Sequence, residues 1–353
     1  MHLFDRVRFG NVELRNRVVV SPMCEYCAED GVPNDWHLVH LGSRAVGGAG
    51  LVFTEATAVS PEGRISPGDT GLWNDAQQQA WQRIAHFIAD QGAAPGIQLA
   101  HAGRKGSTEV PWRGGKALAA DNGAWTPVAP SAVPFDKDYP QPAALDAKGI
   151  QKVIVDFAAS ARRAREAGFK VIEVHAAHGY LVHEFLSPLS NHRTDEYGGS
   201  LENRARLLRG IIATVRREWP APHPLFVRVS ATDWTEGGWD IDECVQLARM
   251  LKSDGVDLID TSSGGNVPHA KIPGSTPGYQ VAFAERIRRD AHIATGAVGM
   301  ITNARQAQEI LERGEADLII MAREFLRDPY FPRRAAKELG SDIAAPQQYQ
   351  RAW

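Results

Sequence analysis

The sequence has little cysteine and no long apolar or basic run. Three of its 353 residues are cysteine, at positions 24, 27 and 244, which is too few for the disulfide framework of a small secreted domain. No apolar stretch approaches the roughly 20 residues that a membrane-spanning helix needs, and MHLFDRVRFG at the start lacks the apolar core of a signal peptide. The net charge is −3, without a basic patch. We therefore expect a cytoplasmic protein that binds neither nucleic acid nor a membrane.

The glycine signatures of nucleotide-binding loops are also missing. Neither G-x-G-x-x-G after an early strand nor G-x-x-x-x-G-K-[ST] occurs in the chain. A doubly wound sheet, the main rival fold, would need the first of these. If a nicotinamide nucleotide is used, a Rossmann domain does not hold it.

Short apolar segments alternate with amphipathic ones along the chain. We expect strands at 18–21, 51–54, 96–99, 171–174, 225–230, 256–260, 293–298 and 317–321. We expect helices at 36–46, 75–91, 150–167, 201–219, 242–253, 281–289, 303–312 and 332–339. About eight strands, each followed by a helix, is the pattern of a closed (β/α)8 barrel, the TIM barrel. The sequence thus predicts one α/β domain over residues 1–353.

One segment breaks this alternation. Residues 106–144 follow the third expected strand, are rich in Gly, Pro, Ala and Trp, and show no clear period. Loops of this length are usually functional lids or disordered segments. Because the segment leaves the end of a strand, we predict a lid or insertion loop over the active site.

The stretch VIEVHAAHGY, residues 171–180, begins as a buried strand and ends in His175, His178 and Tyr180. Barrel enzymes place their chemistry at such strand ends. Two neutral imidazoles that donate to one oxygen would stabilise negative charge developing on it. Zinc ligation is an alternative, but the pair lacks a nearby third ligand, and structural histidines are another. We expect no metal, and Tyr180, whose unperturbed pKa is ~10, would give its proton only to a strong base.

Two further pairs of positions suggest a bound cofactor. Gly299-Met300 and Ala322-Arg323 follow the seventh and eighth expected strands, where barrels often bind phosphate. The alternative for Arg323 is an ion pair with a neighbouring carboxylate, Glu324 or Asp328.

Gln98 and Arg228 lie on or beside barrel strands. Together they could form hydrogen bonds with the polar edge of a planar heterocycle, because the Gln98 amide both donates and accepts and the Arg228 guanidinium donates. The alternative is an internal polar network. Cys24 and Cys27 form a lone C-x-x-C, a weak metal or redox signal without a second pair.

Several motifs, taken together and in order, resemble those of one known family. They are LRNR (14–17), SPMC (21–24), QLAHAGRK (98–105), HAAHGY (175–180), SNHRTDEYGGS (190–200), GAVGM (296–300) and QYQRAW (348–353). The chain resembles the Old Yellow Enzyme flavoproteins, in particular the bacterial NADPH dehydrogenase and thermophilic-like ene-reductase branch. The resemblance covers nearly the whole chain.

The resemblance implies non-covalent FMN at the C-terminal mouth of the barrel. The residues that would contact the flavin are Ser21, Pro22, Met23, Cys24, Ala56, Gln98 and Arg228. The residues that would hold its phosphate are Gly299, Met300, Ala322 and Arg323. Cys24 would tune the flavin potential, His175 and His178 would bind the substrate carbonyl with help from Tyr26, and Tyr180 would donate the proton.

The implied activity is NAD(P)H:alkene oxidoreduction, an ene-reductase reaction on small, electron-poor alkenes such as α,β-unsaturated aldehydes, ketones, imides and nitro compounds. NADPH is the implied donor, with NADH possible. The alternatives are a nitro-compound or xenobiotic reductase and a non-catalytic flavin-binding protein. The resemblance also implies a homodimer or homotetramer in which the tail 346–353 lies at the subunit interface and Arg351 reaches the neighbouring active site.

The chain departs from the family pattern at three places. Ala322 stands where glycine is frequent, and its methyl group crowds the approach of a phosphate. The segment 105–144 is longer than in the shortest relatives, which affects the shape of the substrate entrance. Cys27 is not a usual residue of the family.

Overall fold

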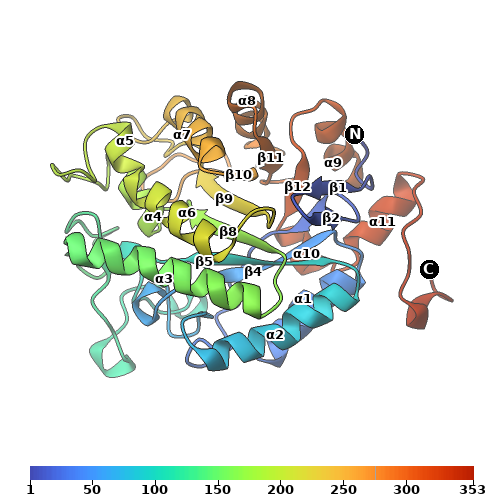
Figure 1. Cartoon of the computed structure of the whole chain (residues 1–353), viewed down its shortest axis with the longest axis horizontal. Coiled ribbons are helices and arrows are strands. Elements are labelled where there is room, and N and C mark those ends of the chain that lie inside the picture. The colour runs from blue at the N-terminus through green and yellow to red at the C-terminus, as the bar shows by residue number, and fades with distance from the viewer. Residues whose placement is uncertain (275) are drawn as a thin grey trace.

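Eight parallel strands close into one barrel in the computed structural model, which describes residues 1–274 and 276–353 (Figure 1). The strands are β3 (Val18–Val20), β4 (Leu51–Ala58), β5 (Ala94–Ala100), β8 (Val171–Ala176), β9 (Leu225–Ser230), β10 (Leu258–Ser262), β11 (Ala294–Ala297) and β12 (Leu318–Met321). They follow one another around the barrel in chain order, and β12 pairs with β3 to close it. The predicted TIM barrel is confirmed.

Helices surround the barrel (Figure 1). The longer ones are α1 (Asp35–Val46), α2 (Asp75–Asp90), α3 (Ala147–Glu166), α6 (Arg206–Glu218), α7 (Ile241–Ser253), α8 (Val281–Ala291), α9 (Ala304–Glu312) and α11 (Phe331–Glu338). The short ones are α4 (Leu181–Leu186), α5 (Leu201–Arg204) and α10 (Arg323–Arg327). Side-chain caps fix where several begin. Asn74, for example, accepts from the Gln77 N–H, and the Gln77 side chain accepts from the Asn74 N–H in return.

The barrel interior changes from apolar to polar along its axis. An apolar cluster fills the end where the strands begin, and the hairpin of β1 (Val7–Phe9) and β2 (Val12–Leu14) adds Phe9 and Leu14 to it. On β9, Phe226 belongs to this cluster, whereas the buried Arg228 lies two residues further along the strand. Side chains two apart on a strand point to the same side. The interior is therefore closed at one end and lined by polar groups towards the other.

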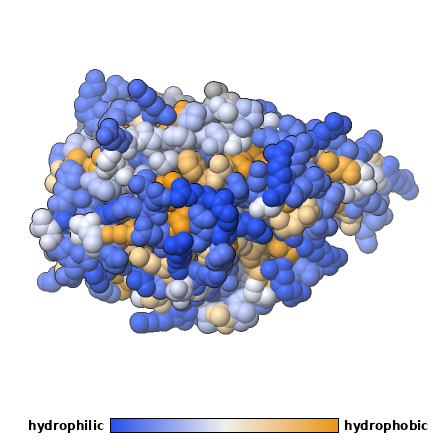
Figure 2. Space-filling model, turned by 90° about the horizontal axis from the view of Figure 1, so that it is seen from above, coloured by the Kyte–Doolittle hydropathy of each residue, from blue (hydrophilic) through white to orange (hydrophobic). Residues whose placement is uncertain are grey.

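A larger apolar shell lies between the strands and the helices. Trp81, Phe157 and Trp219 are among its fully buried side chains. On the face that Figure 2 shows, by contrast, the surface is largely hydrophilic, with apolar side chains in small scattered patches. None of the helices in the described residues is long and apolar enough to cross a membrane.

Several local predictions were wrong. The expected helix 201–219 is divided into α5 and α6 at Ala205, whose N–H is shared between the Leu201 and Asn203 carbonyls in a tightened turn. The sixth strand begins at Leu258 rather than 256 and runs on to Ser262, because its register follows β9 through Ser230. The second strand extends to Ala58 through a register shift between Phe53 and Ala56.

The segment 106–144 has more local structure than its composition predicts. It contains the 3₁₀ turns Pro111–Arg113 and Ala120–Asn122, and the two-residue strands β6 (Val128–Ala129) and β7 (Ala143–Ala144) pair with each other. Its role as a lid stays a prediction.

Candidate active site

A cavity of about 290 Å³ opens at the C-terminal ends of the strands. It brings together eight residues predicted for the site, namely Ser21, Pro22, His178, Arg228, Gly299, Met300, Ala322 and Arg323. They come from the ends of β3, β8, β9, β11 and β12. The strand ends of one barrel meet at one mouth, so residues far apart in the sequence line a single cavity.

Other predicted residues lie around this cavity. Ala56 and Tyr180 line a small neighbouring pocket, and Tyr26 lines an opening of about 390 Å³ with Trp112. Arg351 is exposed in the C-terminal tail and lines none of these three cavities.

The loops after β11 and β12 form a cradle with a free guanidinium. Gly299 has a φ of +114°, and a Cβ there would lie 2.5 Å from Gln280 Nε2, so only glycine fits this turn. Arg323 Nη2 lies 3.1 Å from the sulfur of Met300, a weak acceptor. Glu324 and Asp328, the two predicted alternative partners, pair with Arg327 and Arg334 instead. In the described part of the chain Arg323 makes no ion pair, and its charge suits a phosphate.

Gln98 and Arg228 both belong to a buried polar network. Gln98 Nε2 donates to Glu173 Oε1 over 2.8 Å, and Arg228 Nε donates to Asp260 Oδ2 over 2.6 Å. Arg228 Nη2 also donates to Ser21 Oγ over 2.9 Å at the cavity. The internal network that the sequence left open as an alternative therefore exists, and Arg228 lines the cavity as well.

Burial lowers the pKa of Arg228, but Asp260 and Glu173 outweigh that effect and raise it above its ordinary value. Sequence reasoning missed both carboxylates. The available signal was an acidic residue directly after two apolar residues in each of two buried strands.

The tautomer of His175 is fixed by the backbone. The Ala177 N–H donates to His175 Nδ1 over 3.2 Å, and burial lowers the pKa of the ring well below its usual value. A neutral imidazole whose Nδ1 accepts carries its proton on Nε2. His175 is therefore a neutral donor at the strand end.

The rings of His178 and Tyr180 both lie close to the ring of His175. The ring centroid of His175 lies 5.3 Å from that of His178 and 5.1 Å from that of Tyr180. Burial also lowers the pKa of His178 and raises that of Tyr180. His178 Nε2 lies 2.6 Å from Ser262 Oγ. The structure thus brings the two imidazoles and the phenol together, as the sequence predicted.

Lys105 and Gly265 hold the backbone of the segment that carries these rings. Lys105 Nζ donates to the carbonyls of His178 and Gly265 over 3.0 and 3.1 Å, and lies 5.1 Å from the Tyr180 ring centroid. A Cβ on Gly179 would lie 2.2 Å from the Gly265 oxygen, so the loops after β8 and β10 touch backbone to backbone.

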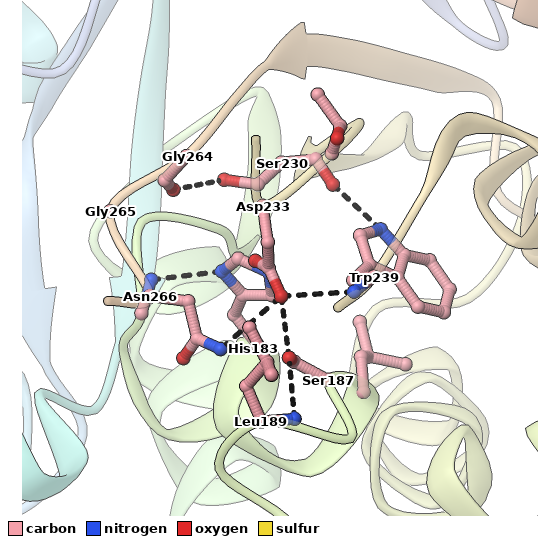
Figure 3. A network of polar contacts seen from close by, with 12 residues as sticks. His183, Ser187, Leu189, Ser230, Asp233, Trp239, Gly264, Gly265 and Asn266 are labelled. Carbon is pink, nitrogen blue, oxygen red and sulfur yellow. Dashed lines mark hydrogen bonds and ion pairs between the residues drawn. The ribbon is translucent and has the colours of Figure 1, made fainter. Parts of the chain in front are cut away.

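A buried network of polar contacts holds the same segment as well (Figure 3). The Gly179 N–H donates to His183 Nδ1 over 2.9 Å, and His183 Nε2 lies 3.1 Å from Asp233 Oδ1, without the angle of a hydrogen bond. Asp233 Oδ2 accepts from Ser187 Oγ over 2.5 Å and from the Trp239 N–H over 3.0 Å. Nothing in the sequence signals this network, whose members follow two different strands, β8 and β9.

The segment after β3 places a thiol and a phenol beside the cavity. Burial raises the pKa of Cys24 well above its usual range, so this side chain is a thiol. Tyr26 has a φ of +52°, and His178 (+59°) and Met300 (+52°) share this left-handed conformation, which non-glycine residues rarely adopt. Such strain gathers at functional sites.

Cys27 is a free thiol whose sulfur lies 3.8 Å from His37 Nε2. Cys24 is free as well. No group of three or more His, Cys, Asp or Glu side chains that could hold a metal occurs in residues 1–274 and 276–353.

Comparison with known proteins decides the family. The sequence pattern of the NADH:flavin oxidoreductase / NADH oxidase family matches residues 2–342. The chain belongs to this family. It is therefore an FMN-dependent oxidoreductase that takes electrons from a nicotinamide nucleotide. The predicted membership of the Old Yellow Enzyme family is confirmed.

Individual relatives agree with this assignment. The chain is 50% identical to the NADPH dehydrogenase of Bacillus subtilis (strain 168) over 353 residues, 99% of each chain. Among solved structures, morphinone reductase shares 29% identity with a TM-score of 0.80, covering 98% of this chain and 91% of that one. A 2-naphthoyl-CoA reductase shares 28% identity with a TM-score of 0.87, and the match covers 96% of this chain but 52% of that longer chain.

Proposed function

We propose that this oxidoreductase reduces the activated C=C bond of α,β-unsaturated aldehydes, ketones, imides or nitroalkenes, with NADPH as the electron donor. The observation that carries the proposal is the neutral His175 with its proton on Nε2, in ring contact with both His178 and Tyr180. Bound FMN would supply the hydride that reaches the β-carbon of the alkene.

The cavity residues would hold the cofactor. Arg323 and the cradle around Gly299 fit the phosphate, while Gln98 and Arg228 fit the polar edge of the ring. The remaining flavin contacts that we propose are Ser21, Pro22, Met23, Cys24, Ala56, Met300 and Ala322. Because Cys24 is a thiol, it would tune the flavin potential without adding a charge.

His175 and His178 would bind the oxygen of the activating group. Neutral donors stabilise negative charge that develops on this oxygen during reduction, and Tyr26 would assist from the opposite side. Tyr180 would then protonate the α-carbon. Its raised pKa is no obstacle, because an enolate carbon is a strong enough base to take a phenolic proton.

NADPH is proposed over NADH because the relatives that share 50% identity with this chain over its whole length are named NADPH dehydrogenases. The segment 106–144 would act as a lid. Its Trp112 ring lies 5.9 Å from the Tyr26 ring, at an opening beside the active site.

We also propose a homodimer or homotetramer with the tail 346–353 at the interface. Tyr349 and Trp353 are about half exposed on this tail, at 45% and 47%, and aromatic residues are enriched at interfaces. Arg351 of one subunit would reach the active site of its neighbour.

The test is a purification followed by a substrate screen. The protein should contain about one FMN per chain, released on denaturation. NADPH should bleach its colour, and cyclohexenone should restore the colour with turnover. Bleaching without turnover of any activated alkene would identify a flavin protein with another acceptor, and would contradict the proposal.

A further inference from the structure

Two carboxyl side chains lie beside the guanidinium of Arg228, and both are fully buried. Asp260 Oδ2 accepts from Arg228 Nε over 2.6 Å. Glu173 Oε1 is 3.7 Å from the same nitrogen and accepts from Gln98 Nε2 over 2.8 Å. One cation therefore stands beside two acids. With both acids ionised the cluster would carry an uncompensated buried negative charge, which is a costly state.

One oxygen of each carboxyl group is left without a donor. Glu173 Oε2 and Asp260 Oδ1 are buried and have no hydrogen-bond partner among the described residues. Both groups lie beside the same nitrogen, Arg228 Nε, at 3.7 Å for Glu173 and 2.6 Å for Asp260, and the charge of Asp260 raises the pKa of Glu173. Two carboxylates cannot hydrogen-bond to each other, because both are acceptors only, whereas a carboxylic acid can donate to a carboxylate.

We propose that Glu173 and Asp260 share a single proton, carried by Glu173, so that Arg228 and Asp260 form a neutral pair beside the flavin site. Glu173 is then a positioning residue, which acts on the cofactor through Gln98 and Arg228. The proposal rests on FMN binding and not on the identity of the alkene.

The geometry assigns the proton to Glu173 rather than to Asp260. Arg228 approaches Asp260 closely with two of its nitrogens, Nε and Nη2, but stands 3.7 Å from Glu173. The acid nearer the cation stays ionised. Burial and the neighbouring Asp260 raise the pKa of Glu173 well above its ordinary value, in agreement with this assignment.

Among residues 1–274 and 276–353, no further cation lies close enough to compensate a second negative charge. In the described residues, Arg228 is the one cation within salt-bridge distance of either acid. His175, which pairs with Arg228 across β8 and β9, is held neutral by burial. The other partners, Gln98 and Ser21, are uncharged.

The shared proton would matter for the flavin because of where Arg228 points. Arg228 lines the cavity and donates towards Ser21 there. A positive charge near a bound anion stabilises it. With Asp260 ionised the pair with Arg228 is already neutral, so a second carboxylate would make the cluster net negative and oppose an anionic flavin; the proton on Glu173 prevents that.

The experiment compares Glu173→Gln with Asp260→Asn. Glu173→Gln replaces a neutral acid with a neutral amide that can still accept from Gln98, so the flavin midpoint potential should stay at its original value. Asp260→Asn removes a negative charge, while burial, the larger cause of the raised pKa of Glu173, still favours the protonated acid, so the midpoint potential should rise. An upward shift of similar size in both variants would overturn the proposal, since it would mean that both acids are ionised.

Infrared difference spectra give a second readout that does not need FMN. The spectrum of the original protein minus that of Glu173→Gln should show the loss of a protonated carboxyl band, in holoenzyme and apoprotein alike. Loss of a carboxylate band instead would overturn the assignment. This comparison also decides the question if Asp260→Asn fails to retain FMN, and a failure of the protein to reduce alkenes would leave it unaffected.

Discussion

The Ala177 N–H donates to His175 Nδ1 over 3.2 Å, and this one contact determines which nitrogen of the ring carries the proton. Burial keeps the ring neutral by lowering its pKa. The backbone of the segment after β8 therefore presents a neutral Nε2–H donor before any ligand arrives.

His175→Ala should weaken the binding of phenolate ligands, which place an oxyanion where a substrate carbonyl would lie. Loss of one donor to an oxyanion costs about 3 kcal/mol, or roughly 100-fold in affinity. Titration of the flavin absorbance with a phenol measures the effect, and the exposed His192→Ala is the control. Because the pKa of His175 is lowered, its titration should cause no step in affinity between about pH 6 and pH 8. Equal affinity of the variant and the original protein would contradict the proposed role.

Tyr180→Phe should separate the two half-reactions. Flavin reduction by NADPH should be nearly unaffected, whereas alkene reduction should slow by roughly 10²–10⁴-fold, the usual contribution of a general acid. Stopped-flow spectra of each half-reaction measure this, with Tyr197→Phe as the control. The slowing should be greatest for weakly activated alkenes. If both half-reactions slowed equally, the role of Tyr180 would be structural.

Arg323→Ala should weaken FMN binding but not riboflavin binding. The guanidinium has no acidic partner in the described residues, and a hydrogen bond to a charged group contributes about 1.5–3 kcal/mol, or roughly 10- to 100-fold in affinity. Fluorescence titration of the apoprotein with both flavins measures the difference. Arg327→Ala is the matched control, because Arg327 lines the same cavity but is already paired with Glu324. A similar loss for both flavins would exclude a phosphate contact.

Much of this site follows from the barrel pattern. Gly299 and Arg323 could be assigned to one cavity because β11 and β12 are consecutive parallel strands, whose ends must lie side by side. The rings of His175 and Tyr180 were found for a similar reason, since His175 lies at the end of β8 and Tyr180 follows that strand closely.

What the sequence could not show depends on register and on long-range contacts. Glu173 and Asp260 meet Arg228 only because three strands align with a particular register, and a single sequence does not reveal it. The His183–Asp233 pair likewise joins helix α4 to the loop after β9, which is distant in the chain. The hairpin of β1 and β2 was missed because each strand has three residues, too few for a periodic signal.

Glu184→Gln should change how stability depends on pH. Glu184 is fully buried and accepts the Arg104 N–H over 2.8 Å, and burial raises its pKa from 4.5 to about 8, although Arg104 opposes the shift. The folded protein therefore keeps a proton that the unfolded chain loses, so this group destabilises the fold as pH rises from about 4.5 to 8. The gap in Tm between the variant and the original protein should shift in favour of the variant over this range.

The exposed Glu309→Gln, on α9, should show no such trend. Thermal unfolding at several pH values measures both variants. A pH-independent gap for Glu184→Gln would mean that Glu184 is ionised in the folded protein.

Deletion of residues 349–353 tests the proposed interface. In the structure, Trp353 packs on its own subunit, with the Arg333 guanidinium 3.8 Å above its ring and Tyr330 at 5.3 Å. Terminal segments are normally frayed unless such contacts hold them. The deletion should weaken the oligomer and raise the Michaelis constant for the alkene, as measured by analytical ultracentrifugation and steady-state kinetics.

Arg351→Ala tests whether this side chain acts in a neighbouring active site, and it leaves the contacts that hold the tail in place. Because the aromatic contacts of Trp353 and Tyr349 remain, the oligomer should persist. Arg351 is exposed on its own subunit, so the loss of its charge should change substrate affinity more than FMN content if it completes a neighbouring site. Mixing Arg351→Ala with a Tyr180→Phe variant provides the decisive measurement. In mixed oligomers, one site can then combine an intact Tyr180 with an intact Arg351 from its neighbour, so activity should exceed the sum of the two separate variants. A fully active monomer after deletion of the tail would contradict the shared site.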